Sequence, residues 1–174
     1  MKSIRKIKLY LLLICFLINI VYVTPSYSLS PQEDLFKNAL NLSSSGEFNL
    51  ALKQWNKYLE LFPDDAAALS NRGNIKLVNG DPEGAIEDQD KAIELDPGEV
   101  DPYINRGIAE ESLGLWLQAK NDYLYVISKD KDNFSALYNF ANVEGSLSNW
   151  QSARNLFSKA SESNPGFAMA RSSM

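Results

Sequence analysis

The sequence contains no histidine, and its one cysteine, Cys15, lies among the first 28 residues. Histidine is the side chain that most often acts as a general base near neutral pH and most often binds transition metals. Residues 29–174 also lack any thiol, which excludes a disulfide, a cysteine nucleophile and a thiolate metal site from that part of the chain. We therefore expect no catalytic residue, no metal site and no cofactor.

Positive charge is scarce after residue 28. Four of the 17 basic residues and none of the 22 acidic ones lie before that point, so residues 29–174 hold 13 bases against 22 acids, a net charge of −9. This sign repels phosphate backbones and anionic lipid surfaces. Nucleic acid is therefore not an expected partner.

The amino terminus resembles an export signal. A basic start is followed by an apolar run over residues 9–23, and Pro25, Ser26 and Ser28 then resemble a signal-peptidase site. Fifteen helical residues span about 22 Å, less than the ~30 Å hydrocarbon core of a bilayer. We predict that residues 1–28 are a signal peptide, removed on export to a periplasm or thylakoid lumen. The alternative is a retained membrane anchor.

The rest of the chain is a repeat with a period of 34 residues and no insertion or deletion. The segments are 32–65, 66–99, 100–133 and 134–167. Their eighth and twentieth positions are always small, and their fourth and twenty-fourth positions are mostly large and apolar. In chain order the small positions hold Ala39, Ala51, Gly73, Ala85, Gly107, Ala119, Ala141 and Ala153, and the large ones hold Leu35, Trp55, Leu69, Gln89, Tyr103, Tyr123, Leu137 and Phe157.

This pattern predicts two packed helices in each repeat, because small residues let two helices approach closely while large apolar ones fill the space beside the contact. Turns are expected at Gly46, Gly80, Gly114 and Ser148, since glycine suits the left-handed end of a helix. Prolines at the thirty-second position should end the second helix. One helical hairpin cannot bury its apolar face alone, so the hairpins should stack. Ala85 and Gly107 are predicted to be buried.

The repeat resembles the tetratricopeptide repeat over residues 32–167. The resemblance implies an all-α superhelix, or solenoid, of four helix-turn-helix repeats within a domain spanning 29–167. Residues 168–174 read like the start of a further repeat, which predicts that the array continues past Met174. Tyr58 and Val126 depart from the family by occupying a normally small twenty-seventh position. The run SNRGNIKLVNGDPEGAIEDQDKAIELDP and the export signal also resemble repeat proteins of the chloroplast lumen and of cyanobacteria.

Two kinds of charged residue could act as functional groups. The acidic pair Glu110–Glu111 could do acid–base chemistry, but we interpret it as part of a solvated helix surface. Arg72 and Arg106 could capture an anion. We favour the reading in which their stems cover apolar surface and their guanidinium groups pair with acids such as Glu110, one helical turn after Arg106.

In the tetratricopeptide family the concave groove is lined by the second, fifth, sixth, ninth, twelfth and thirteenth positions of each repeat. Carried onto this sequence, the resemblance places five asparagines and one tyrosine on that wall: Asn71, Asn74, Asn105, Asn139, Asn142 and Tyr138. An asparagine amide offers a donor and an acceptor that match an extended peptide backbone. These residues are our predicted protein-binding site. Hydrogen bonding between neighbouring repeats is the alternative role of Asn71, Asn105 and Asn139.

Some members of the family clamp a C-terminal carboxylate with two lysines, two asparagines and an arginine. Asn74 and Asn105 match the asparagines, whereas Ser70, Ser135 and Asn139 stand where the cations are needed. The resemblance therefore argues against that activity. We predict a non-catalytic scaffold or assembly factor that binds a protein segment in its groove after export. The alternatives are a membrane-anchored organiser and a regulatory module of a longer protein.

Overall fold

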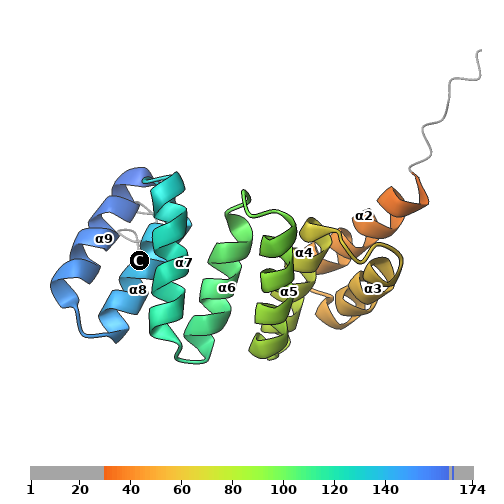
Figure 1. Cartoon of the computed structure of the whole chain (residues 1–174), viewed down its shortest axis with the longest axis horizontal. Helices are drawn as coiled ribbons and strands as arrows, with labels where there is room; N and C mark the ends of the chain where they lie inside the picture. The colour runs from red at the N-terminus through yellow and green to blue at the C-terminus, as the bar shows by residue number, and fades with distance from the viewer. Residues whose placement is uncertain (1–29, 165, 167–174) are drawn as a thin grey trace, which may run out of the picture. The chain divides into compact units, whose positions relative to one another are not determined.

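The computed structural model describes residues 30–164 and 166. These residues form eight α-helices and no strand, which confirms two helices in each 34-residue repeat (Figure 1). In chain order the helices are α2 (Pro31–Ser44), α3 (Phe48–Leu61), α4 (Ala66–Val78), α5 (Pro82–Leu95), α6 (Asp101–Ser112), α7 (Trp116–Lys129), α8 (Phe134–Ser146) and α9 (Trp150–Ser163). The predicted signal peptide at 1–28 and the predicted start of a fifth repeat at 168–174 lie outside the described residues.

All four turns inside the repeats have the left-handed backbone that the sequence predicts. Gly46, Gly80 and Gly114 have φ angles of 80°, 83° and 72°, and Ser148 has 64° at the fourth turn. For a residue with a side chain this conformation costs roughly 1 to 2 kcal/mol. The fourth turn therefore keeps the geometry of the other three although it lacks their glycine.

The second helix of a repeat ends at the same position with or without proline. In the first two repeats that helix ends at Leu61 and Leu95, two residues before the proline. In the third repeat Lys131 replaces the proline, yet α7 ends at the equivalent residue, Lys129. The next helix, α8, begins with a side-chain cap. The Asn133 side chain accepts a hydrogen bond from the Ala136 amide at 3.0 Å. A capped start of the next helix is thus sufficient to separate the two helices without proline.

The small repeat positions lie where the two helices of a hairpin touch. Ala85 is 1% exposed and Gly107 is buried, as predicted. A methyl group on Gly107 would stand 2.7 Å from ring carbons of Tyr123, which is fully buried on α7. Gly107 is therefore required by the close approach of α6 to α7.

Gly107→Ala should lower the free energy of unfolding by about 1 to 3 kcal/mol, because the buried Tyr123 ring has to move to admit the methyl group. Gly145→Ala on α8 is the matched control, since its nearest neighbour would be Trp150 at 3.8 Å. The control should be neutral or gain up to about 1 kcal/mol. Urea unfolding followed by circular dichroism measures the free energy of unfolding of both variants. Equal losses at the two positions would contradict a specific contact between α6 and α7.

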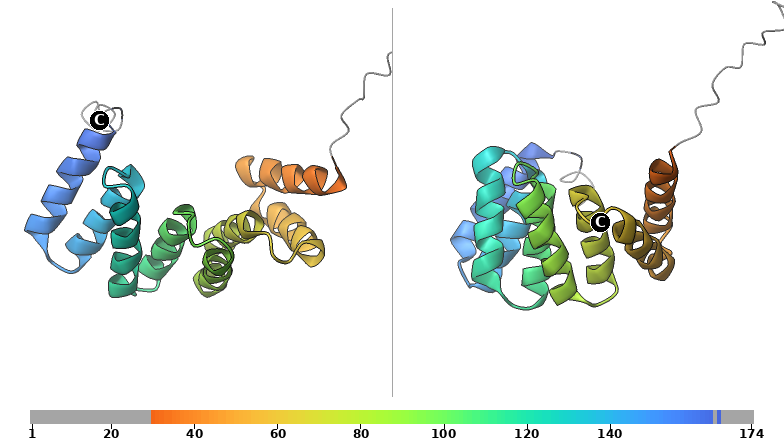
Figure 2. Two further views of the ribbon diagram at one scale, coloured as in Figure 1. Left: turned by 45° about the horizontal axis from the view of Figure 1, so that its top comes forward. Right: turned by 45° about the vertical axis from the view of Figure 1, so that its right-hand side comes forward.

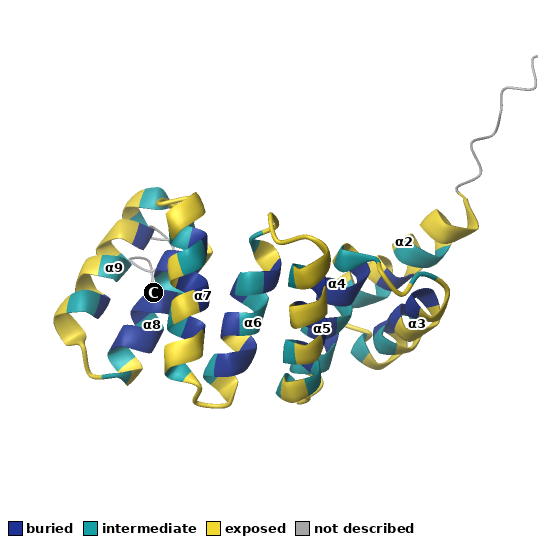
Figure 3. Cartoon of the chain, in the orientation of Figure 1, coloured by how far each residue is buried: buried dark blue, intermediate teal, exposed yellow. Residues whose placement is uncertain are grey.

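Each hairpin packs on the next, and α6 and α8, the first helices of the third and fourth repeats, each contact both helices of the repeat before (Figure 2). Buried residues follow the seams between helices, whereas the outer faces are exposed (Figure 3). In the first repeat the seam is aromatic. The Trp55 ring meets the Phe36 ring edge-on at 5.0 Å, and the Tyr58 ring lies 5.3 Å from Phe36. Tyr58 thus fills a position that is normally small.

None of the eight described helices is both long enough and apolar enough to span a bilayer.

Candidate functional site

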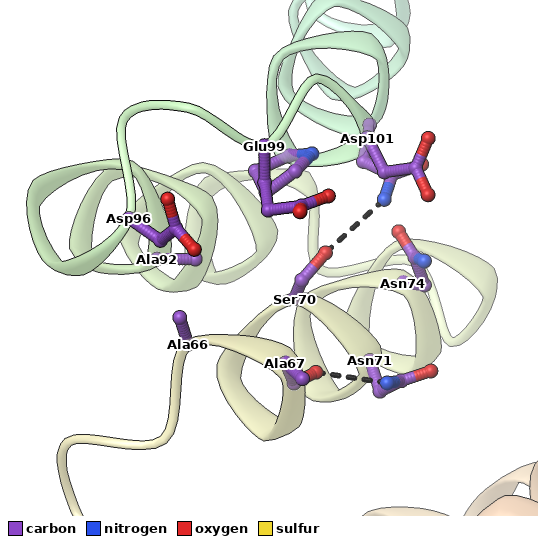
Figure 4. A pocket seen from close by; sticks show the side chains of 11 residues that line it. Ala66, Ala67, Ser70, Asn71, Asn74, Ala92, Asp96, Glu99 and Asp101 are labelled. Carbon is purple, nitrogen blue, oxygen red and sulfur yellow. Dashed lines mark hydrogen bonds between the residues drawn. The ribbon is translucent and has the colours of Figure 1, made fainter.

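A groove of about 380 Å³ lies between α4 and the α5–α6 corner. Its floor is made of small side chains, Ala66, Ala67, Ser70 and Ala92, which leave room for another chain. Three of the asparagines predicted to bind protein, Asn71, Asn74 and Asn105, line it. Figure 4 shows Asn71 and Asn74 on α4, with Asp96, Glu99 and Asp101 on the other side of the groove.

Each of these three amides uses one of its two ends within the protein. Asn71 Nδ2 donates to the Ala67 carbonyl at 2.8 Å, and Asn105 Nδ2 donates to Ser70 Oγ at 3.2 Å. Asn74 Oδ1 accepts a hydrogen bond from Gln89 Nε2 at 3.3 Å. The bonds orient the amides, and among the described residues no bond engages their opposite ends. The bond of Asn105 to Ser70 joins neighbouring repeats, as the alternative role of this residue predicts.

The other three predicted residues lie farther along the chain, on α8. Asn142 lines a separate, shallow depression against α9, together with Trp150 and Phe157. The Tyr138 ring packs at 5.4 Å from Phe157 and is stacked on Phe134. Asn139 occupies on α8 the repeat position of Asn71 and Asn105, and it does not line the groove between α4 and α6. The structure thus brings together three of the six predicted residues.

The two arginines that precede the repeat glycines hold a repeated ion pair. Arg72 on α4 makes two hydrogen bonds to Asp88 on α5, at 2.7 and 2.6 Å. Arg106 on α6 makes the same pair with Asp122 on α7, at 2.8 and 2.6 Å. A third nitrogen of Arg106 reaches Asp90 of the preceding repeat at 2.6 Å. The prediction that both arginines pair with acids is confirmed. Glu110 was the wrong partner for Arg106, because the stacking presents better-aligned acids from α5 and α7.

The interpretation of Glu110 as a solvated surface residue was also wrong. Glu110 is only 8% exposed, and no hydrogen bond from the described residues reaches its Oε2. Burial and the negative charge of Asp122 raise the pKa of Glu110 to about 7. The positive charge of Arg106 lowers this pKa, and the negative charge of Asp90 raises it further. The neighbouring Glu111 accepts a hydrogen bond from the Tyr123 hydroxyl, and its pKa is also raised by burial.

A raised pKa means that the folded state holds its proton more tightly than the unfolded state does. The contribution of Glu110 to stability is therefore complete below about pH 4.5 and is lost as the pH rises through about 7. Glu110→Gln should stabilise the protein by about 1 to 3 kcal/mol more at pH 8 than at pH 5. Urea unfolding at both pH values checks this, with Glu60→Gln at an exposed position of α3 as the control. If the effect of Glu110→Gln on the free energy of unfolding did not change with pH, this would contradict the raised pKa of Glu110.

Comparison with known proteins identifies the repeat. A family model described as "Tetratricopeptide repeat" matches residues 36–100, which include the whole of α3, α4 and α5. Residues 36–100 are thus tetratricopeptide repeats. Sperm-associated antigen 1 of Rattus norvegicus is 29% identical over 115 residues, which is 66% of this chain and 13% of that protein. Tetratricopeptide repeat protein 36 of Homo sapiens is 27% identical over 105 residues, 58% of this chain and 56% of that protein. The chain thus spans from about an eighth to just over half of the length of these relatives.

Solved tetratricopeptide structures show the same fold. A crystal structure of MamA aligns with a TM-score of 0.68 at 23% identity, covering 76% of this chain and 77% of the other. The first tetratricopeptide domain of Spaghetti (RPAP3), bound to the HSP90 peptide SRMEEVD, aligns with a TM-score of 0.65 at 21% identity, covering 67% and 93%. At these identities the likeness supports the fold alone.

Sequence reasoning missed the acidic side of the tetratricopeptide groove. Asp96, Glu99 and Asp101 line the groove opposite α4, and all three are exposed. Asp101 occupies the second position of its repeat, one of those that line the concave wall in this family, so that it could have been found. Asp96 and Glu99 flank Pro97 and Gly98 in the segment between α5 and α6, and their orientation depends on how that segment bends.

Proposed function

We propose that this chain is a non-catalytic scaffold that binds an extended segment of a partner protein in the groove between α4 and the α5–α6 corner. The observation that carries the proposal is the groove itself, with a floor of small side chains and three oriented amides along its wall. An extended peptide backbone presents both donors and acceptors, to which the remaining amide groups of the groove can bond. Tetratricopeptide domains of RPAP3 similar to this chain have been solved with bound peptides, which supports the same use of the fold here.

The ionisable groups near the groove support a role without catalysis. Arg72, Asp88, Arg106 and Asp122 are held in ion pairs between the helices of a hairpin, where they stabilise the fold. Glu110 is buried beside the second pair, among residues that do not line the groove. Residues 29–174 contain no histidine or cysteine that could act as a base or a nucleophile.

Selection from a random peptide display library tests the proposal. Ala67 is exposed on the groove floor, so Ala67→Trp should fill the groove without disturbing the core. Selected peptides should bind the full chain and bind the Ala67→Trp variant at least about tenfold more weakly, a loss of ~1.4 kcal/mol. Gln118→Trp places the same side chain on an exposed face of α7 and should leave binding unchanged. Peptides that bind both variants equally, or a selection without binders, would overturn the proposal.

We also propose that the scaffold acts after export, in a periplasm or thylakoid lumen. The support is the basic start, the apolar run over residues 9–23 and the Ser26–Ser28 cleavage pattern. Mass spectrometry of the protein from its native cells should find an amino terminus near Leu29. An intact Met1 on a membrane-bound form would replace this proposal with that of a membrane-anchored organiser.

A further inference from the structure

The groove presents an unbalanced set of charges. Three carboxylates, those of Asp96, Glu99 and Asp101, line its α5–α6 side, and neither lysine nor arginine is among its lining residues. All three acids are exposed, so that they can meet a ligand without first giving up a buried partner. Figure 4 shows them across the groove from Ser70 and Asn71 on α4. A ligand in the groove would therefore lie between a row of acids and a row of amides.

The arginines closest in sequence to the groove residues do not offset this charge. Arg72 is bonded to Asp88 and, through Nη1, to Asn56 Oδ1 at 3.2 Å on α3. Arg106 is bonded to Asp122 and Asp90 on two different helices. Arg106 is thus neutralised by two acids outside the groove, and Arg72 is held outside it by Asp88, which also pairs with Lys76. A negatively charged peptide end would find no cation there and would meet three carboxylates.

The hydrogen-bonding atoms that remain available point to the same ligand. Asn71 and Asn105 each use one N–H of the NH₂ group on Ala67 and Ser70, which leaves the second N–H as a donor and Oδ1 as an acceptor. Asn74, whose Oδ1 is held by Gln89, offers its NH₂ group as a donor. With the three carboxylates added, the groove holds more acceptors than donors, and all of its charge is negative. Lysine ammonium and arginine guanidinium groups are donors without acceptors, and they bond most strongly to carboxylates.

We infer that the groove recognises a positively charged segment of its partner, with lysine or arginine side chains directed at Asp96, Glu99 and Asp101 and its backbone along Asn71, Asn74 and Asn105. The inference rests on the proposed function and names the chemistry of the partner. It also separates this groove from those of the two RPAP3 domains, whose bound peptides, SRMEEVD and SGPTIEEVD, end in acidic residues. Ion pairing at an exposed rim is screened by salt, so affinity should fall as ionic strength rises.

Two synthetic peptides of nine residues test the inference on the full chain by fluorescence anisotropy. One carries three lysines separated by alanine and serine, and the other carries glutamates in their place. The triple variant Asp96→Asn, Glu99→Gln, Asp101→Asn removes the charge while keeping the shape, so that the Gly98 amide still finds its acceptor on residue 96. The control variant Glu94→Gln, Asp132→Asn, Glu162→Gln makes the same change of net charge at exposed positions elsewhere.

The lysine peptide should bind, and the groove triple variant should weaken its binding at least tenfold while the control changes it less than twofold. Equal weakening by both triple variants would show only the long-range field of an acidic protein and would overturn the inference. Failure of the lysine peptide to bind below about 1 mM would also overturn it. If the glutamate peptide binds more tightly than the lysine peptide, and Ala67→Trp abolishes that binding, the inference would be overturned. The proposed function would still stand. Binding of either peptide that Ala67→Trp does not affect would count against both.

Discussion

We expect Arg106→Met to lower the free energy of unfolding by about 3 to 5 kcal/mol, because it strands a buried acid. The Asp122 side chain is 8% exposed, and both of its oxygens bond to Arg106. Without the cation, Asp122 would face the buried Glu110 as a second uncompensated carboxyl group. Asp90 would lose the same partner, but its side chain is 51% exposed, so water can take the place of the arginine. Urea unfolding at pH 8, where carboxylates are ionised, measures the loss.

The fourth repeat supplies the control for this prediction. At the positions of Arg106 and Asp122 it carries Phe140, which is buried, and Leu156, which packs on the same apolar cluster. The double variant Arg106→Phe with Asp122→Leu copies that apolar pair, and it should recover at least half of the lost stability. Replacing a buried ion pair by packed apolar residues is often neutral, whereas removing one partner is not. If Arg106→Met alone lowers the free energy of unfolding by less than about 1 kcal/mol, water already solvates Asp122.

Trp55→Ala should destabilise the protein by about 3 to 5 kcal/mol, since it empties the centre of the first repeat. Trp55 is fully buried, its ring meets Phe36 and Tyr58 edge-on, and its Nε1 donates to Ser43 Oγ at 3.0 Å. Loss of the ring removes both the apolar contacts and that hydrogen bond. Urea unfolding followed by circular dichroism, with the wild-type chain in parallel, measures the change.

Trp150→Ala is the matched control for Trp55. Trp150 is 69% exposed at the start of α9, so its removal should change the free energy of unfolding by about 0.5 kcal/mol or less. The two variants delete the same side chain and differ only in burial. Similar losses at both positions would contradict the placement of Trp55 at the centre of the packed hairpin.

The sequence alone predicted the helices and their turns because those depend on local rules that repeat every 34 residues. Gly80 marks a turn by its own backbone preference, and Ala85 marks a helix contact by its size. The partner of Arg106 could not be read in this way. Asp122 and Asp90 both lie 16 residues from it, on α7 and α5, and only the stacking of hairpins shows which acid each nitrogen meets.

The site was less predictable than the fold for the same reason. The repeat positions correctly placed Asn71 and Asn105 on one groove, because equivalent positions on stacked helices face the same wall. They did not show that Tyr138 would be held against Phe157. Nor did they show the acidity of the groove, since Asp96 and Glu99 belong to a connection whose course depends on tertiary packing. Glu110 was misjudged because acidic residues on helices are usually solvated.

A positively charged partner segment in the groove between α4 and the α5–α6 corner would contact the amides of Asn71, Asn74 and Asn105. Asparagine side chains carry NH₂ groups with their own nuclear magnetic resonance signals, so titration of the full chain with the lysine peptide tests this binding directly. We expect the side-chain signals of Asn71, Asn74 and Asn105 to shift together and to saturate with the binding curve, while those of Asn79 and Asn155 stay in place. Shifts confined to the α8–α9 end, or spread evenly over the acidic surface, would contradict it.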